Sequence, residues 1–198
     1  MKRSAAALSE GNCRSLHDSA AVEVLRGMGG FTNILHEVIG RVVGRHRGNP
    51  RMTRVYEHVA GELTREVPRL RHHVQGHLLR VSLAPRQSSH QPGSSRAQRA
   101  PLGDGCYSEL RLQSADLDWV GIVDLLQVED GKCSIWEFKS GAPDEQHEEQ
   151  LRSYTLLWAD DKTRNPAGIP VVRLVLSYAD RWFVVAPPGP EMLSALRD

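Results

Sequence analysis

Asp130 and Gly131 lie between two apolar segments that have the character of β-strands, residues 117–128 and 132–139. Asp-Gly is a preferred pair for a two-residue hairpin turn, because both central residues need a positive φ. The turn fixes the register of the hairpin, since opposed residues then lie at equal distances from it. The predicted pairs are Glu129 with Lys132, Gln127 with Ser134, and Asp124 with Glu137. Directly opposed residues have Cβ atoms about 4.5 to 5.5 Å apart, so two carboxylates are expected to meet on this hairpin.

Side chains alternate along a strand, and the hairpin therefore sorts its residues onto two faces. Lys139 follows Glu137 by two positions and shares its face. The apolar residues of this face are Ile122, Leu126 and Ile135, and those of the reverse face are Val123, Leu125, Trp136 and Phe138. Because both faces are apolar, both need to be covered. This is the pattern of a sheet that has helices on its two sides.

The two predicted carboxylates point to a cation site. Two acidic groups in a partly buried place repel each other and resist ionisation unless a cation neutralises them. Oxygen ligands favour a hard ion, Mg²⁺ or Mn²⁺. Lys139 beside such an ion can stabilise charge on a phosphate, or orient and help to deprotonate a water molecule. The alternative is a simple ion pair of Lys139 with a carboxylate inside a sheet.

The segments around the hairpin predict an α/β fold with a mixed central sheet flanked by helices. Helical spacing of apolar residues predicts helices over 31–43, 53–66 and 69–83, the last two strongly basic, and further helices over 144–159 and 191–197. Strands are also predicted over 106–113, 171–178 and 181–186. A length of 198 residues fits one domain, with a mainly helical basic part (1–83), a flexible loop (84–105), and the sheet with its helices (106–198).

The net charge of +1 hides a strong asymmetry along the chain. Residues 1–100 hold 16 Lys and Arg against 7 Asp and Glu, a net charge of +9, and residues 101–198 hold 9 against 17, a net charge of −8. A basic part beside an acidic part fits a phosphate-binding surface next to a cation site, although arginine-rich surface helices give the same pattern. The arginines expected to contact nucleic-acid phosphates are Arg41, Arg45, Arg47, Arg51 and Arg54.

Composition argues against several other classes of protein. No apolar stretch is long enough to span a bilayer, and the apolar run 5–8 is too short for a signal peptide, so a cytoplasmic protein without membrane contact is expected. Three widely spaced cysteines favour reduced thiols, and the absence of a set of four argues against an iron–sulfur cluster. Three histidines at helical spacing, His72, His73 and His77, fit a solvated basic face better than a zinc site.

Three motifs follow one another along the chain: Gly121-Ile122-Val123-Asp124, Glu137-Phe138-Lys139 and Gln150-Leu151-Arg152-Ser153-Tyr154. They resemble the Gly-x-x-Asp strand, the Glu-x-Lys strand and the Gln-x-x-x-Tyr helix of the PD-(D/E)XK nuclease superfamily, and within it of the RecB-like exonuclease domains. His36 resembles the histidine that opens the RecB-like pattern, and Glu109 falls where such domains often have a further glutamate. The resemblance covers about residues 28–186.

The resemblance implies a restriction-endonuclease-like core and a centre that holds Mg²⁺ or Mn²⁺. In such a centre Asp124, Glu137 and the Phe138 carbonyl would bind the metal, and Lys139 would be catalytic. His36 would approach the metal. Its place at the margin of the apolar stripe of its helix fits a structural histidine equally well.

Two interpretations remain open for each of three further residues. Gln150 and Tyr154 share one face of a helix, and the resemblance implies that they contact substrate phosphate or bases. Packing of that helix through Tyr154 is the alternative, since aromatic residues at helical spacing usually belong to the core. Glu109 would be a ligand of a second metal ion or a support for the first, or a strand residue that faces solvent.

Together these observations predict a metal-dependent nuclease that hydrolyses phosphodiester bonds, with DNA as the expected substrate, RNA not excluded, and an action like that of an exonuclease. One alternative is a nucleic-acid-binding or assembly module that keeps the fold without turnover. Another is a Mg²⁺-dependent hydrolase of small substrates, and the basic charge of residues 1–100 argues against it. The chain has no phosphate-binding Gly-Lys-Ser/Thr loop, so ATP-driven unwinding would need a partner helicase.

Overall fold

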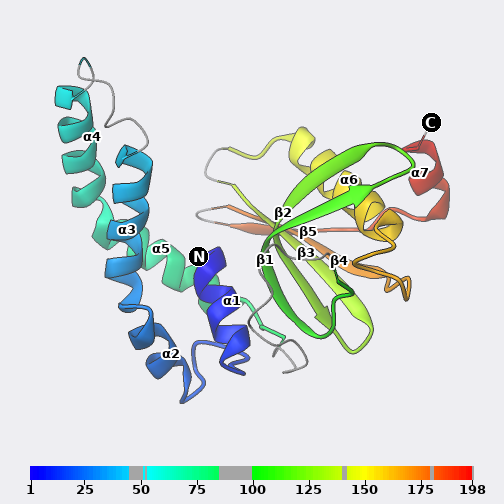
Figure 1. Cartoon of the computed structure of the whole chain (residues 1–198), viewed down its shortest axis with the longest axis horizontal. Helices are drawn as coiled ribbons and strands as arrows, with labels where there is room; N and C mark the ends of the chain where they lie inside the picture. Colours follow the sequence, from blue (N-terminus) through cyan, green and yellow to red (C-terminus); the bar gives the residue numbers. More distant parts are fainter. Residues whose placement is uncertain (45–50, 52, 85–99, 140–141, 179–180, 198) are drawn as a thin grey trace. The chain divides into compact units, whose positions relative to one another are not determined.

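The computed structural model describes residues 1–44, 51, 53–84, 100–139, 142–178 and 181–197 (Figure 1). By its internal contacts the chain divides into two compact units. One is helical and consists of Ser15–Val81 together with Met1. The other contains the sheet and consists of Lys2–Arg14 and Ser82–Asp198. A single domain over residues 1–198 stays a prediction.

The second unit is built on a five-stranded mixed sheet. Its strands are β1 (Gly105–Ser114), β2 (Trp119–Glu129), β3 (Lys132–Phe138), β4 (Val171–Ser177) and β5 (Trp182–Val185), in the spatial order β1-β2-β3-β4-β5. Every neighbouring pair is antiparallel except β3 and β4, which are parallel. A parallel pair needs a crossover connection, and α6 (Glu145–Asp160) supplies it.

The turn between β2 and β3 has the predicted geometry. Asp130 and Gly131 both have positive φ, 51° and 69°. The ladder contains the predicted pairs of Glu129 with Lys132 and of Gln127 with Ser134, and it ends at Leu125 with Trp136. The local turn rule therefore predicts the register of this hairpin correctly along the ladder.

Helix α6 covers one face of the sheet, and the main core lies between them (Figure 1). Asp144 caps the helix, because its carboxylate accepts a hydrogen bond from the Gln146 N–H at 2.9 Å. The helix buries Leu151, Leu157 and Trp158, which pack against apolar side chains of β1 to β4. This packing determines which side of α6 faces β2 and β3.

Helix α1 (Lys2–Glu10) packs against β1, which is an edge strand of the sheet. It buries Ala5 and Leu8. The Ser9 hydroxyl donates to the Ala84 carbonyl at 2.6 Å and accepts from the Cys106 N–H of β1 at 2.9 Å. Helix α1 thereby ties an otherwise unpaired edge of the sheet. At the other end of the chain, Arg197, which follows α7 (Pro190–Ala195), forms an ion pair with Asp160 of α6 at 2.6 Å.

The helical unit consists of α2 (Ala21–Gly27), α3 (Gly30–Gly44), α4 (Thr53–Arg65) and α5 (Val67–Arg80). Ile39 and Val43 of α3 and Val67 of α5 form its small core, against which Tyr56 and Leu63 of α4 pack. Pro68 stands in the first turn of α5, where a missing N–H costs nothing. The break predicted near Pro68 is therefore the boundary between α4 and α5.

The predicted α/β class, with a mixed sheet flanked by helices, is confirmed. The sequence patterns did not indicate α1 or α2, and α1 belongs with the sheet rather than with the other N-terminal helices. Most of the loop predicted over 84–105 lies outside the described residues. None of the helices in the described part of the chain combines the length and apolar character needed to cross a membrane.

Candidate functional site

Asp124 lies where the ladder between β1 and β2 is interrupted. The pairs run without a change of register from Gly105 with Val128 to Ser114 with Trp119, but the pair of Glu109 with Asp124 is missing. Glu109 has a φ of 54°, in the left-handed region. The two acidic residues therefore stand opposite each other where neither strand follows the regular pleat.

This interruption changes which side chains of β2 face the core. Val123 and Leu126 both belong to the core beneath α6, although they are three residues apart. Ile122, predicted on the covered face with Asp124, is 54% exposed, and that prediction is wrong. The reason is the break at Asp124, because strict alternation holds only along a regular strand.

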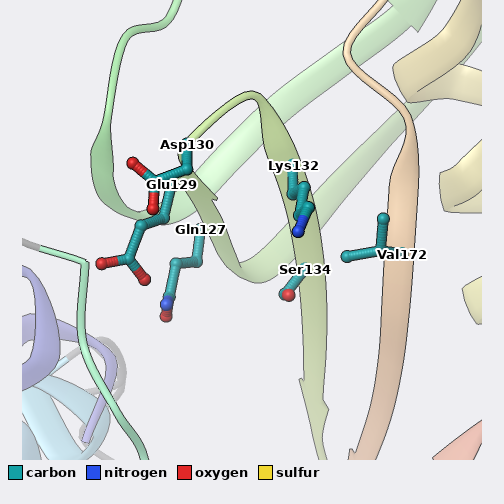
Figure 2. Close-up of a pocket in the computed structure, with 6 residues that line it drawn as sticks. All are labelled: Gln127, Glu129, Asp130, Lys132, Ser134 and Val172. Carbon is teal, nitrogen blue, oxygen red and sulfur yellow. The ribbon is translucent and has the colours of Figure 1, made fainter.

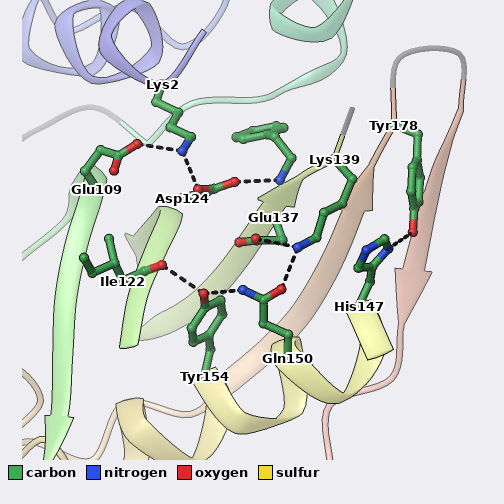
Figure 3. Close-up of polar contacts among 11 residues, drawn as sticks. Lys2, Glu109, Ile122, Asp124, Glu137, Lys139, His147, Gln150, Tyr154 and Tyr178 are labelled. Carbon is green, nitrogen blue, oxygen red and sulfur yellow. Dashed lines mark hydrogen bonds and ion pairs between the residues drawn. The ribbon is translucent and has the colours of Figure 1, made fainter. Parts of the chain in front are cut away.

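The Asp124 carboxylate is fixed by backbone and by charge (Figure 3). Its Oδ2 accepts a hydrogen bond from the Phe138 N–H at 2.9 Å, and its Oδ1 forms an ion pair with the Lys2 ammonium of α1. The direct pairing of Asp124 with Glu137 in the ladder was predicted and is not observed. The ladder of β2 with β3 ends at the pair of Leu125 with Trp136. Beyond it, the Phe138 N–H donates to the Asp124 side chain instead of to a backbone carbonyl of β2.

Glu137 is a buried carboxylate that is only half satisfied. The residue is 5% exposed, and its Oε1 lies 3.0 Å from the Lys139 Nζ. Its Oε2 is buried and has no hydrogen-bond partner among the described residues. Burial raises the pKa of Glu137, and the charge of Asp124 adds to this, while the hydrogen bond from Lys139 acts in the opposite direction. The carboxylate thus has an oxygen ready for a further ligand.

Lys139 is held by a chain of hydrogen bonds that begins on α6 (Figure 3). Its Nζ donates to the Gln150 Oε1 at 2.6 Å. The Gln150 Nε2 donates to the Tyr154 hydroxyl at 2.6 Å, and this hydroxyl donates to the Ile122 carbonyl at 2.9 Å. The side chains predicted to contact substrate therefore hold Lys139 in place. Tyr154 also belongs to the core, as the packing alternative predicted, and its contact with substrate stays a prediction.

Gly121 explains how α6 comes so close to β2. A Cβ atom at this position would lie 2.7 Å from the Leu157 Cδ1 and 2.9 Å from the Tyr154 Cε1. No side chain fits there unless the helix moves. The glycine of the Gly-x-x-Asp motif is therefore a packing requirement, and it allows Tyr154 to reach the carbonyl of the residue after it.

Lys2 and Glu109 complete the cluster. The Lys2 Nζ lies 2.6 Å from the Glu109 Oε1 and also pairs with Asp124. Burial alone would lower the pKa of Lys2, but the hydrogen bonds and charges of Asp124 and Glu109 outweigh it and raise this pKa. No pattern in the sequence predicted a role for Lys2, because it stands 107 residues from Glu109 and in a helix that was not predicted.

The other predicted residues lie in the helical unit or beyond the described residues. His36, Arg41 and Arg54 are exposed on α3 and α4, and Arg51 is exposed between these helices. Arg45 and Arg47 lie outside the described residues. The roles predicted for all of these residues stay predictions. The role of the Phe138 carbonyl as a metal ligand also stays a prediction.

The residues of the cluster fit a divalent metal ion. Among the described residues no group of three or more His, Cys, Asp and Glu side chains is arranged to hold a metal. Mg²⁺, however, is commonly held by one or two carboxylates, with water and substrate as further ligands. The unpartnered Oε2 of Glu137 lies beside the negative charge of Asp124, and this is where a hard cation would bind most favourably.

A comparison with protein families supports this interpretation of the cluster. Residues 28–184 match the model of the PD-(D/E)XK nuclease superfamily. The chain belongs to this superfamily. The match includes the strands and the helix α6 that carry Asp124, Glu137, Lys139 and Gln150, and the mixed sheet with its flanking helices has the restriction-endonuclease-like fold. A search of curated proteins found no match to this chain.

The opposite end of the same hairpin carries a polar hollow (Figure 2). Its volume is about 260 Å³, and it lies next to the turn rather than at the carboxylates. The residues that line it are Gln127, Glu129, Asp130, Lys132, Ser134 and Val172. None of the predicted site residues lines this hollow.

Proposed function

We propose that this member of the PD-(D/E)XK superfamily is a Mg²⁺- or Mn²⁺-dependent nuclease of the RecB-like type, which hydrolyses phosphodiester bonds of DNA. The observation that carries the proposal is the buried Oε2 of Glu137, which has no hydrogen-bond partner among the described residues and lies beside Asp124 and Lys139. An unpaired carboxylate oxygen is costly in a folded protein. A cation bound there satisfies it.

The proposed metal ligands are the carboxylates of Asp124 and Glu137 and the carbonyl of Phe138, with His36 as a further ligand. When it is bound, the ion supplies Lewis-acid charge to the phosphate and lowers the pKa of a water molecule. The hydrogen bond from the Phe138 N–H fixes Asp124 so that one of its oxygens keeps a defined direction.

Lys139 is the proposed catalytic residue. Its ammonium group donates to Glu137 and to Gln150, and a primary ammonium has a third hydrogen to offer. We propose that this hydrogen points to the scissile phosphate and that its charge stabilises the pentacovalent transition state. Gln150 and Tyr154 orient the ammonium, because their hydrogen bonds run from Lys139 to the backbone of β2.

Phosphate binding is proposed for the arginines of the basic part of the chain. The helices α3 and α4 present Arg41 and Arg54 to solvent, and Arg45, Arg47 and Arg51 belong to the segment between them. Contacts to phosphates position a strand without strong sequence preference. An exonuclease needs this kind of binding, since it must act on successive nucleotides of any sequence.

Labelled linear and circular DNA, single- and double-stranded, test the proposal in the presence of Mg²⁺, Mn²⁺ or EDTA. Cleavage of linear DNA is expected with either metal and not with EDTA, and Lys139→Ala is expected to lower it by about 10²- to 10⁴-fold. Lys132→Ala is the matched control, because Lys132 stands at the other end of β3, at the hollow of Figure 2. Absence of metal-dependent cleavage, or equal cleavage by Lys139→Ala, contradicts the proposal. Cleavage of circular DNA would show endonuclease action.

A further inference from the structure

Lys2 brings a positive charge to the carboxylates from an element that the family match does not include (Figure 3). The match begins at residue 28, whereas Lys2 stands at the start of α1. Its ammonium contacts two carboxylates at once, the Oε1 of Glu109 at 2.6 Å and the Oδ1 of Asp124. The Lys2 side chain is 31% exposed, so these contacts are partly shielded from water.

Glu109 adopts an unusual backbone conformation at this contact. A non-glycine residue at a φ of 54° is uncommon, and such a conformation persists only where its surroundings hold it. It interrupts the ladder of β1 with β2 opposite Asp124. The regular pairing of β1 with β2 is therefore interrupted where Glu109 and Asp124 share the Lys2 ammonium.

The three carboxylates define two separate positions for a cation. Asp124 and Glu109 enclose the first, and the ammonium of Lys2 fills it. The second lies at the unpartnered Oε2 of Glu137, on the other side of Asp124 from Lys2 in Figure 3. In hydrolases with two metal ions, the ions lie about 3.5 to 4 Å apart on either side of the reacting groups. Asp124 has the place of a ligand shared between two such positions.

We propose that the ammonium of Lys2 takes the place of a second divalent cation between Asp124 and Glu109, so that the centre binds one divalent ion per chain. The inference rests on the proposed function, since the single ion is the one held at Glu137 and Asp124. The ammonium is tethered by α1, whose residues Ala5, Leu8 and Ser9 are buried against the sheet unit. A fixed charge of this kind is present at every concentration of metal.

The stoichiometry of Mn²⁺ binding tests the inference without a measurement of activity. Isothermal titration of Mn²⁺ into metal-free protein at pH 7.5 is expected to give one ion for the wild type and two for Lys2→Met. Lys2→Arg keeps the charge and is expected to give one ion. Any affinity tag is placed at the C-terminus and removed, so that the surroundings of Lys2 are unchanged. Electron paramagnetic resonance gives an independent readout, because two neighbouring Mn²⁺ ions in Lys2→Met would show a spin-coupled signal.

Two controls separate the position of the charge from its mere removal. Lys132→Met removes the same charge at the far end of the hairpin, and one ion is expected. Glu109→Gln in the background of Lys2→Met removes a carboxylate of the vacated position, and the number of ions is expected to return from two to one. Circular dichroism and thermal unfolding establish that each variant is folded, and Lys2→Gln replaces Lys2→Met if the latter is not.

The outcomes distinguish the inference from the function on which it rests. Two ions bound to the wild type overturn the inference, and this result needs no variant. One ion in both the wild type and Lys2→Met also overturns it, because Lys2 would then only anchor α1. If the wild type binds no divalent ion, the proposed metal centre itself is wrong, and the inference falls with it.

Discussion

The Tyr154 hydroxyl donates a hydrogen bond to the Ile122 carbonyl at 2.9 Å and thereby joins α6 to β2 two residues before Asp124. The same hydroxyl accepts a hydrogen bond from Gln150, which in turn holds Lys139. One side chain of the helix thus links the position of the lysine to the strand that carries the aspartate. The spacing of the Gln-x-x-x-Tyr motif puts Gln150 and Tyr154 on one face of the helix, because residues four apart are neighbours there. Their side chains can therefore hydrogen-bond to each other.

Tyr154→Phe tests whether this motif positions Lys139. Loss of the hydroxyl removes the hydrogen bonds of the Ile122 carbonyl and of the Gln150 Nε2 with Tyr154, and a cost of about 1 kcal/mol in the free energy of unfolding is expected. Lys139 becomes less well oriented, so kcat is expected to fall by about tenfold while KM changes little. Steady-state kinetics on a labelled oligonucleotide and thermal unfolding measure the two effects.

Tyr107→Phe is the matched control for this substitution. The Tyr107 hydroxyl donates to the Gly103 carbonyl at 2.8 Å in an exposed place on β1, and its loss should leave kcat unchanged. A contact of Tyr154 with substrate predicts a different result. In that case Tyr154→Phe would raise KM and leave kcat near that of the wild type, and the positioning role would be wrong.

Gly121→Ala is expected to separate α6 from β2. The new methyl group would meet Leu157 and Tyr154 closer than van der Waals contact allows, and overpacking of this kind typically costs about 1 to 3 kcal/mol. Chemical denaturation should show this loss, and cleavage should fall with it because Tyr154 moves away from the Ile122 carbonyl. Gly103→Ala is the control, since no atom lies within 4 Å of its added Cβ. Equal stability of the two variants would show that α6 adjusts without cost.

Local rules in the sequence predict the turn of the hairpin and the register of its ladder. Asp130 and Gly131 fix the turn through their own backbone preferences, and the register to Leu125 with Trp136 follows from it. The rule fails beyond this pair. The sequence near Asp124 does not indicate the positive φ of Glu109 on the opposite strand. Glu109 pairs with Lys2 of α1, which is distant in the sequence.

Lys2 shows what the sequence could not supply. Its partners, Glu109 and Asp124, stand more than one hundred residues away, and α1 has only nine residues. A helix of this length has little stability of its own and depends on tertiary packing. Its existence and its place on β1 are therefore decided by the folded structure, whereas the longer α3 and α6 were predicted from their spacing.

Arg41 and Arg54 are expected to contribute to DNA binding through phosphates. Each contact with a phosphate adds about −0.9 to the slope of log K against log salt concentration for duplex DNA. The double variant Arg41→Ala/Arg54→Ala should therefore bind more weakly and with a shallower slope, by about 1 to 2 units. Fluorescence anisotropy measures both quantities at salt concentrations from about 50 to about 200 mM. Phosphate contacts weaken over this range.

Two paired arginines of the same helical unit are the control for that experiment. Arg26 pairs with Glu23 at 2.8 Å on α2, and Arg65 pairs with Glu62 on α4. The variant Arg26→Ala/Arg65→Ala removes the same formal charge but should leave the slope closer to that of the wild type. If both double variants reduce the slope equally, binding depends on the total charge of the unit and not on a surface formed by Arg41 and Arg54.

Glu137→Gln is expected to stabilise the metal-free protein and to destabilise it relative to the wild type when a divalent ion is present. Because the pKa of Glu137 is raised in the folded protein, the ionised side chain destabilises the metal-free fold at neutral pH. The neutral amide removes this penalty, and a gain of about 1 kcal/mol corresponds to a Tm higher by about 2 to 4 °C. With Mg²⁺ or Mn²⁺ present the order should invert, since only the wild type keeps the carboxylate that binds the ion.

The difference in stability between Glu137→Gln and the wild type should depend on pH. The penalty of ionised Glu137 is absent below the pKa of an unfolded glutamate, about 4.3. It develops as the pH rises through the raised folded pKa, and it is complete above it. The metal-free variant should therefore match the wild type in acid and exceed it at pH 7 to 8. Thermal unfolding across this range, with EDTA or with Mn²⁺, tests both halves. A wild type that is more stable than Glu137→Gln in EDTA at pH 8 would show that Lys139 alone satisfies this carboxylate, and the case for a cation at its second oxygen would be lost.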